Sequence, residues 1–131
     1  MTRKEPIQMP HNPQELHRLL HLQGEIKEIQ SAFDSYQRAC FKERPAEFFA
    51  LELNGEAGEL ANNEKKLWKG ETVARELVED EAADVFIALM NYCNAREIPL
   101  GRAVAAKLVT IEKRRQDANP APDAPTEPEA T

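Results

Sequence analysis

Two short acidic motifs carry the chemistry that this sequence suggests. The first is Glu-Ala-Gly-Glu at residues 56–59, and the second is Glu-Ala-Ala-Asp at residues 81–84. Each motif places two carboxylates three residues apart, and residues at i and i+3 lie on the same face of an α-helix. Two such helices packed face to face would therefore bring four carboxylates together.

A cluster of four carboxylates is unfavourable without a cation, because the charges repel one another and burial removes their water. Oxygen-only ligands suit hard divalent cations, Mg²⁺ above all and Mn²⁺ as an alternative. The sequence therefore predicts a metal site whose ligands are Glu56, Glu59, Glu81 and Asp84.

A solvated helix face is the competing interpretation of the same motifs, since the chain holds 23 aspartate and glutamate residues. Two features favour a site. Small and apolar residues such as Ala57 and Val85 flank the motifs, and polar stripes continue from them in helical register. The stripes are Glu52, Glu56, Glu59 and Asn63 in the first segment, and Leu77, Glu81, Asp84, Ala88 and Asn91 in the second.

The elements that must position these residues are all helical. Apolar residues recur every three or four positions, and no segment alternates as a strand would. We expect one all-α domain at 13–116 with a four-helix bundle-like fold, between a flexible arm at 1–12 and a Pro-rich disordered tail at 117–131. The predicted helices span 13–42, 45–68, 72–97 and 100–116. Gly24 marks a bend in the first helix, Gly70 ends the second and Thr72 caps the third.

Composition restricts the partners. The 131 residues are 41% hydrophobic and 31% charged, with a formal net charge of −6 and no basic stripe, which argues against nucleic-acid binding. No apolar run is long enough to cross a membrane, so we expect no membrane partner and a cytoplasmic protein. Cys40 and Cys93 lie within helical patterns and are predicted to be buried thiols in a reducing compartment.

The order of the motifs resembles the MazG-like branch of the all-α NTP pyrophosphatase superfamily. The similarity covers about residues 31–115. It is carried by Leu-Asn-Gly-Glu-Ala-Gly-Glu-Leu at 53–60, Lys-Lys at 65–66, Glu-Ala-Ala-Asp-Val at 81–85, Tyr36, Gln37 and Ala39, and basic Lys107 and Arg114 in the last helix. The chain departs from the family pattern at Gly55, where many relatives have glutamate, and it has no asparagine between Lys107 and Arg114.

The resemblance implies Mg²⁺-dependent hydrolysis of a nucleoside triphosphate to the monophosphate and pyrophosphate, in a homodimer or tetramer. Either Glu52 or Glu56 would take the proton of the attacking water. Trp68 would stack on a base or pack in the core. The candidate substrate contacts are Lys65, Lys66, Trp68, Lys107, Arg114 and Gln37.

Two other function classes use the same helical pattern. A non-catalytic nucleotide-binding or helical interaction protein could keep the bundle, and the missing asparagine in the last helix favours it. A ferritin-like di-metal oxidase needs a Glu-x-x-His motif on facing helices, and the chain has no histidine after His21. His17 and His21, one turn apart, are predicted to be surface residues.

Overall fold

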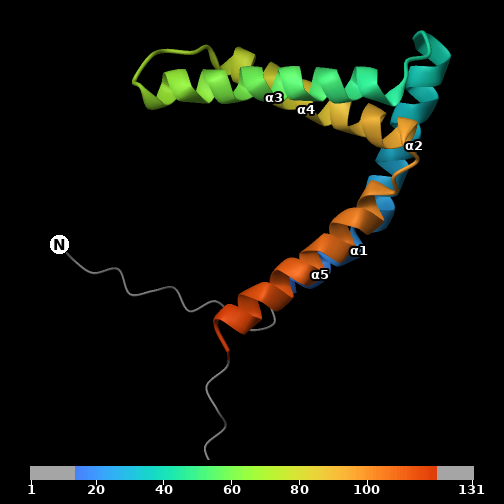
Figure 1. Ribbon diagram of the computed structural model, residues 1–131, viewed down its shortest axis with the longest axis vertical. Coiled ribbons are helices and arrows are strands. Elements are labelled where there is room, and N and C mark those ends of the chain that lie inside the picture. Colours follow the sequence, from blue (N-terminus) through green and yellow to red (C-terminus); the bar gives the residue numbers. More distant parts are fainter. Residues whose placement is uncertain (1–13, 121–131) are drawn as a thin grey trace, which may run out of the picture.

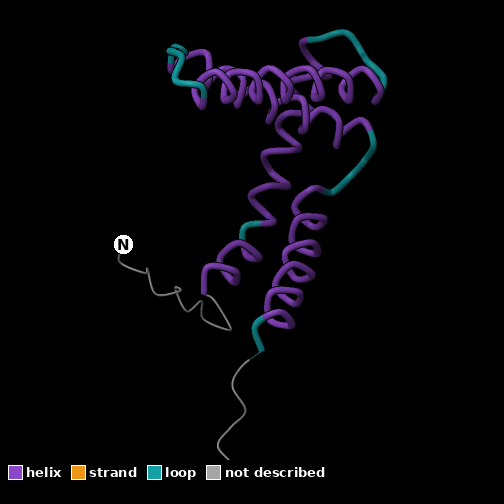
Figure 2. Tube along the Cα trace, turned by 60° about the vertical axis from the view of Figure 1, so that its left-hand side comes forward, coloured by secondary structure: helices purple, strands orange, loops and turns teal. Residues whose placement is uncertain are grey.

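The computed structural model describes residues 14–120, and all of its regular secondary structure is helical (Figures 1 and 2). The predicted all-α class is therefore confirmed for this part of the chain. None of the described helices is long and apolar enough to cross a membrane. The helices are α1 (Gln14–His21), α2 (Gln23–Cys40), α3 (Ala46–Trp68), α4 (Arg75–Ala95) and α5 (Leu100–Ala118).

The five helices form two arms that meet at an angle (Figure 1). Helices α3 and α4 lie side by side as an antiparallel hairpin, which is one arm, while α1 and α2 run along α5 in the other. Helix α2 also packs against α4 where the arms meet. We call this junction of α2, the start of α3 and the end of α4 the elbow. The helices predicted as one bundle are thus spread over two arms.

The first predicted helix is interrupted once. Leu22 separates α1 from α2 with φ −87° and ψ 2°, which lies in the bridge region beside the helical one, and its carbonyl accepts the first hydrogen bond of α2 from the Ile26 N–H at 3.2 Å. The break lies two residues before Gly24, where we expected a bend. The predicted arm at 1–12 and most of the predicted tail at 117–131 fall outside the described residues, although α5 runs to Ala118 rather than to 116.

The connection between α3 and α4 follows the predicted stop signal. Gly70 has φ +84°, a left-handed conformation that costs glycine little, and its N–H donates to the carbonyl of Leu67 at 3.0 Å. The predicted cap of α4 is wrong: Thr72 lies inside the connection, and Ala74 stands at the N-cap without a side-chain hydrogen bond.

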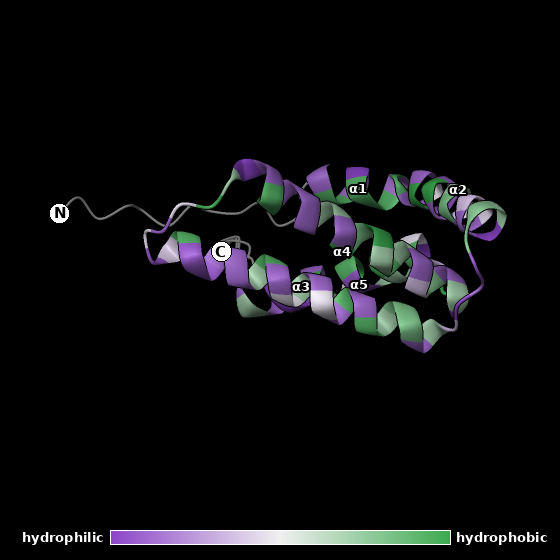
Figure 3. Cartoon of the chain, turned by 90° about the horizontal axis from the view of Figure 1, so that it is seen from above, coloured by the Kyte–Doolittle hydropathy of each residue, from purple (hydrophilic) through white to green (hydrophobic). Residues whose placement is uncertain are grey.

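The buried residues gather near the elbow. The buried apolar residues are Ala46, Phe49, Ala88, Met90 and Cys93. The prediction that both thiols are buried is therefore half wrong, because Cys93 is buried but Cys40, the last residue of α2, is exposed. Large apolar side chains stay exposed in both arms, including Leu51 at 74% and Trp68 at 86%. Hydrophobic residues are accordingly spread over every helix in view (Figure 3).

Candidate metal centre

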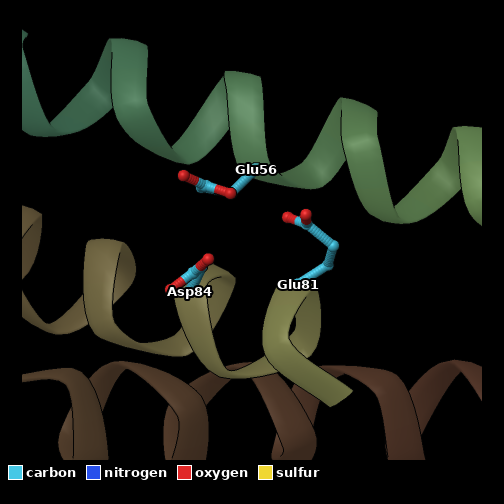
Figure 4. A group of neighbouring side chains, drawn as sticks. All are labelled: Glu56, Glu81 and Asp84. Atoms are coloured by element: carbon cyan, nitrogen blue, oxygen red, sulfur yellow. The ribbon is translucent and has the colours of Figure 1, made fainter. Parts of the chain in front are cut away.

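Three of the predicted carboxylates converge between α3 and α4. Glu56 on α3 points toward α4, and Glu81 and Asp84 on α4 point toward α3 (Figure 4). One carboxylate oxygen from each of the three lies within 4.8 Å of the other two. We call Glu56, Glu81 and Asp84 the carboxylate cluster.

The antiparallel register of the hairpin explains this convergence. Glu56 and Glu59 are three residues apart on α3, and Asp84 and Glu81 are three residues apart on α4 in the opposite chain direction. Each pair occupies one helix face, so the two faces meet along the hairpin. The fourth predicted ligand, Glu59, is exposed and lies outside the cluster, but it is close enough to Glu81 to perturb its ionisation.

The electrostatics of the cluster centre on Glu81. Its pKa is raised from 4.5 to about 7. The largest cause is a hydrogen bond to Glu56, which only the protonated form of Glu81 can donate, and the second is burial. Glu59 adds to the shift as a second hydrogen-bond acceptor and as a like charge. Ionised, Glu81 loses the bond to Glu56, and its Oε2 is buried without a hydrogen-bond partner. Among residues 14–120, no lysine, arginine or histidine forms an ion pair with the cluster.

These observations fit a divalent cation. The donors are all oxygens, two of the three residues are partly buried, and an acceptor atom is left without a proton donor. Glu56, Glu81 and Asp84 would hold the ion, with Glu59 available beside Glu81. A hard ion such as Mg²⁺ or Mn²⁺ suits this donor set.

The other predicted site residues are distributed over both arms. Glu52 is exposed on α3, one turn before Glu56, while Lys65, Lys66 and Trp68 are exposed at the far end of the same helix. Lys107 and Arg114 are exposed on α5, which forms the other arm together with α1 and α2 (Figure 1). One chain therefore does not bring these two basic residues beside the carboxylate cluster, and their role stays a prediction.

Sequence reasoning missed a pocket at the elbow. It has a volume of about 590 Å³ and is lined by residues of α2, α3 and α4, including the predicted substrate contact Gln37 and also Asn91. We call it the elbow pocket. The sequence signals at this pocket were Gln37, a substrate contact that the resemblance implies, and Asn91, which continues the polar stripe of Glu81 and Asp84. No family model, curated protein or solved structure matches this chain.

Proposed function

We propose that this protein is a Mg²⁺-dependent nucleoside triphosphate pyrophosphohydrolase, which converts the triphosphate to the monophosphate and pyrophosphate. The observation that carries the proposal is the convergence of Glu56, Glu81 and Asp84 within 4.8 Å, with no cationic side chain paired to them among the described residues. A site of this kind calls for a cation, and a bound cation in turn favours a polyphosphate ligand.

The reaction assigns separate roles to the residues around the cluster. Glu56, Glu81 and Asp84 would hold Mg²⁺, which would supply neutralisation of phosphate charge and a lower pKa for a bound water molecule. The water oxygen forms a bond to the α-phosphorus, the bond to the bridging oxygen breaks, and pyrophosphate leaves. Glu52 or Glu56 accepts the proton of the water. Cleavage at the α-phosphorus, rather than the γ-phosphorus, rests on the resemblance of residues 53–60 and 81–85 to the MazG-like pattern.

Homo-oligomerisation belongs to the same proposal. Leu51 and Trp68 on α3 expose 74% and 86% of their surface, and Val109 on α5 in the other arm exposes 54%, so each arm presents apolar area that one chain does not cover. A second copy would bury such area. Lys107 and Arg114 of one copy would then lie beside the carboxylate cluster of the other. Sedimentation should then show a dimer or tetramer, and a monomer at micromolar concentration would refute this part.

Product analysis tests the proposed function. The purified protein is incubated with Mg²⁺ and with each common ribo- and deoxynucleoside triphosphate, and the phosphate products are separated. We expect nucleoside monophosphate and pyrophosphate in equal amounts. Orthophosphate with nucleoside diphosphate would refute the cleavage site.

A non-catalytic nucleotide-binding or helical interaction protein is the second candidate. The exposed apolar faces at Leu51 and Trp68 favour it, as does the separation of α5 from the carboxylate cluster within one chain. Saturable nucleotide binding without any phosphate product would support this second candidate over the hydrolase.

A further inference from the structure

The elbow pocket combines aromatic walls with one buried amide. Its aromatic side chains come from α2, α3 and the segment between them: Phe33, Tyr36, Phe41, Phe48 and Phe49. Tyr36 and Phe41 pack edge to face at 5.4 Å between ring centroids, yet expose 57% and 53% of their surface. Ring surface is therefore left available to a flat apolar ligand.

Asn91 is the most deeply buried polar side chain among the pocket residues, with only 7% of its surface exposed. Its Oδ1 atom has no hydrogen-bond partner, and no hydrogen bond of its side chain is found within residues 14–120. A buried acceptor without a donor is unfavourable, because it has lost water and gained nothing in exchange. A hydrocarbon ligand would leave that cost in place, whereas a ligand with a polar edge would remove it.

The pocket adjoins the carboxylate cluster along the α3–α4 hairpin. Asn91 lies seven residues after Asp84, and Phe49 lies seven residues before Glu56. Seven residues are two helical turns, so each pair shares a face and is separated by about 10 Å. Glu52 lines the pocket and stands one turn from Glu56. A ligand lying along the hairpin would reach both the pocket and the cluster.

We propose that the elbow pocket binds the nucleobase of the substrate and that the Asn91 amide hydrogen-bonds its edge; this rests on the proposed nucleotide function. A nucleobase has two apolar faces, which aromatic rings stack on, and an edge that presents a donor beside an acceptor. A side-chain amide offers the complementary acceptor and donor. The triphosphate then lies at the carboxylate cluster, with the sugar between them.

The arrangement makes Asn91 a specificity-determining residue. Bases that match its donor and acceptor are held by two buried hydrogen bonds, and a base-free sugar phosphate has neither these bonds nor the stacking. Arg44 is already engaged over the Phe48 ring, 4.7 Å from its centroid, so it does not compete for the base edge.

A binding experiment on the whole protein tests the proposal without requiring turnover. The side-chain amide signals of Asn91 are followed by ¹H–¹⁵N NMR during titration with the four deoxynucleoside 5′-monophosphates and with deoxyribose 5-phosphate. At least one nucleotide is expected to shift these signals, and the base-free probe is expected to leave them in place. Equal shifts with the base-free probe, or no shift with any nucleotide, would overturn the proposal.

Variants separate a ligand contact from a structural role. Asn91→Leu should weaken binding of the preferred monophosphate by about tenfold while its Tm stays equal to or above that of the wild type. Gln30→Leu, which removes a buried amide that has partners, should lower the Tm and leave the affinity of the folded protein unchanged. A fall in Tm of Asn91→Leu to match Gln30→Leu, or unchanged binding, would contradict the assignment.

The outcomes also separate this inference from the proposed function. Pyrophosphate release that is accompanied by base-independent binding would support the hydrolase and refute the pocket. Nucleotide binding at Asn91 with no pyrophosphate release would support the pocket and refute the hydrolase.

Discussion

Two buried side-chain amides in and beside the elbow differ in whether their polar atoms have hydrogen-bond partners. Gln30 is 9% exposed; its Nε2 donates to the Ile98 carbonyl at 2.6 Å, and its Oε1 accepts from the Leu100 N–H at 3.1 Å. The Asn94 side chain also donates a hydrogen bond, from its Nδ2 to the backbone carbonyl of Gln30 at 2.9 Å. Asn91 is 7% exposed and its Oδ1 has no partner. The first amide ties α2 to the α4–α5 connection, whereas the buried oxygen of the second has no hydrogen-bond partner.

The carboxylates show the same contrast. Glu112 on α5 pairs with Arg115, which lies one turn further along the helix. Glu81 on α4 faces other carboxylates, and its Oε2 is unpartnered. An unpaired buried polar group costs about 1–3 kcal/mol or more, so a fold that keeps two of them is expected to use them for a ligand. The satisfied groups lie on α2 and α5, and the unsatisfied groups lie along the α3–α4 hairpin.

The largest expected effect comes from removing one charge of the cluster. Glu81→Gln should lower pyrophosphate release by more than about 100-fold, because even groups that only orient metal ligands contribute about 10–100-fold. Its Tm in EDTA should equal or exceed that of the wild type, since repulsion is relieved. Asp80→Asn, an exposed neighbour on the same helix, is the matched control and should keep wild-type turnover. Equal losses in the two variants would remove Glu81 from the site.

The second effect is on the pH dependence of metal binding. The pKa of Glu81 is raised to about 7, so a cation must displace a proton below that pH. Mn²⁺ affinity measured by calorimetry should rise by up to about tenfold per pH unit below pH 7 and level off above it.

Without metal, the stability of the protein is expected to fall as pH rises, whereas the affinity for Mn²⁺ rises with pH. Protonation of Glu81 stabilises the fold fully below its ordinary pKa of 4.5, and this contribution is lost as pH rises through about 7. Thermal unfolding in EDTA and in Mn²⁺ should therefore respond to pH in opposite directions. Glu81→Gln should abolish both trends, and an Mn²⁺ affinity that is constant from pH 5.5 to 7.5 would contradict the assignment.

The third effect concerns the satisfied amide. Gln30→Leu leaves the Ile98 carbonyl and the Leu100 N–H without their partner, so the free energy of unfolding should fall by about 2 kcal/mol. Urea unfolding measures this change, with the exposed neighbour Ser31→Ala as the control. A loss below about 0.5 kcal/mol would mean that the elbow is held by other contacts.

Much of the secondary structure and part of the site could be predicted from local pattern. Spacing of i and i+3 placed Glu81 and Asp84 on one helix face, and Gly70 marked the end of α3. Both signals are contained within one or two helical turns. The carboxylate cluster followed because a short connection makes consecutive helices antiparallel, which aligns the two acidic faces.

The arrangement of the arms and the elbow pocket could not be predicted in this way. Periodicity identifies an apolar face but not the helix that covers it, and the apolar side chains of Leu77 and Phe86 on α4 expose 53% and 46% of their surface. Gln30 finds its partners about 70 positions away in the sequence, at Ile98 and Leu100. The burial of Asn91 likewise depends on tertiary packing at the elbow, which its own helix does not specify.

Two glycines within helices differ in whether another part of the chain lies against them. A Cβ at Gly101 would come within 2.6 Å of the carbonyl oxygen of Gln23, so this glycine allows α5 to approach the start of α2. A Cβ at Gly58, between Glu56 and Glu59, would meet nothing within 4 Å. The first glycine is required by packing. The second weakens α3 without a steric reason inside the chain, as Asn91 weakens the elbow.

The smallest expected effect is that of Gly58→Ala. Alanine restricts the unfolded chain and favours the helix, so the free energy of unfolding should rise by about 0.5–1 kcal/mol in urea. Gly101→Ala should instead lower it, by about 1–3 kcal/mol, because backbone atoms must move apart. If the open space beside Gly58 admits the substrate or a second copy, turnover in Gly58→Ala should fall severalfold although the protein is more stable. A more stable variant with unchanged turnover would show that nothing approaches α3 at this point.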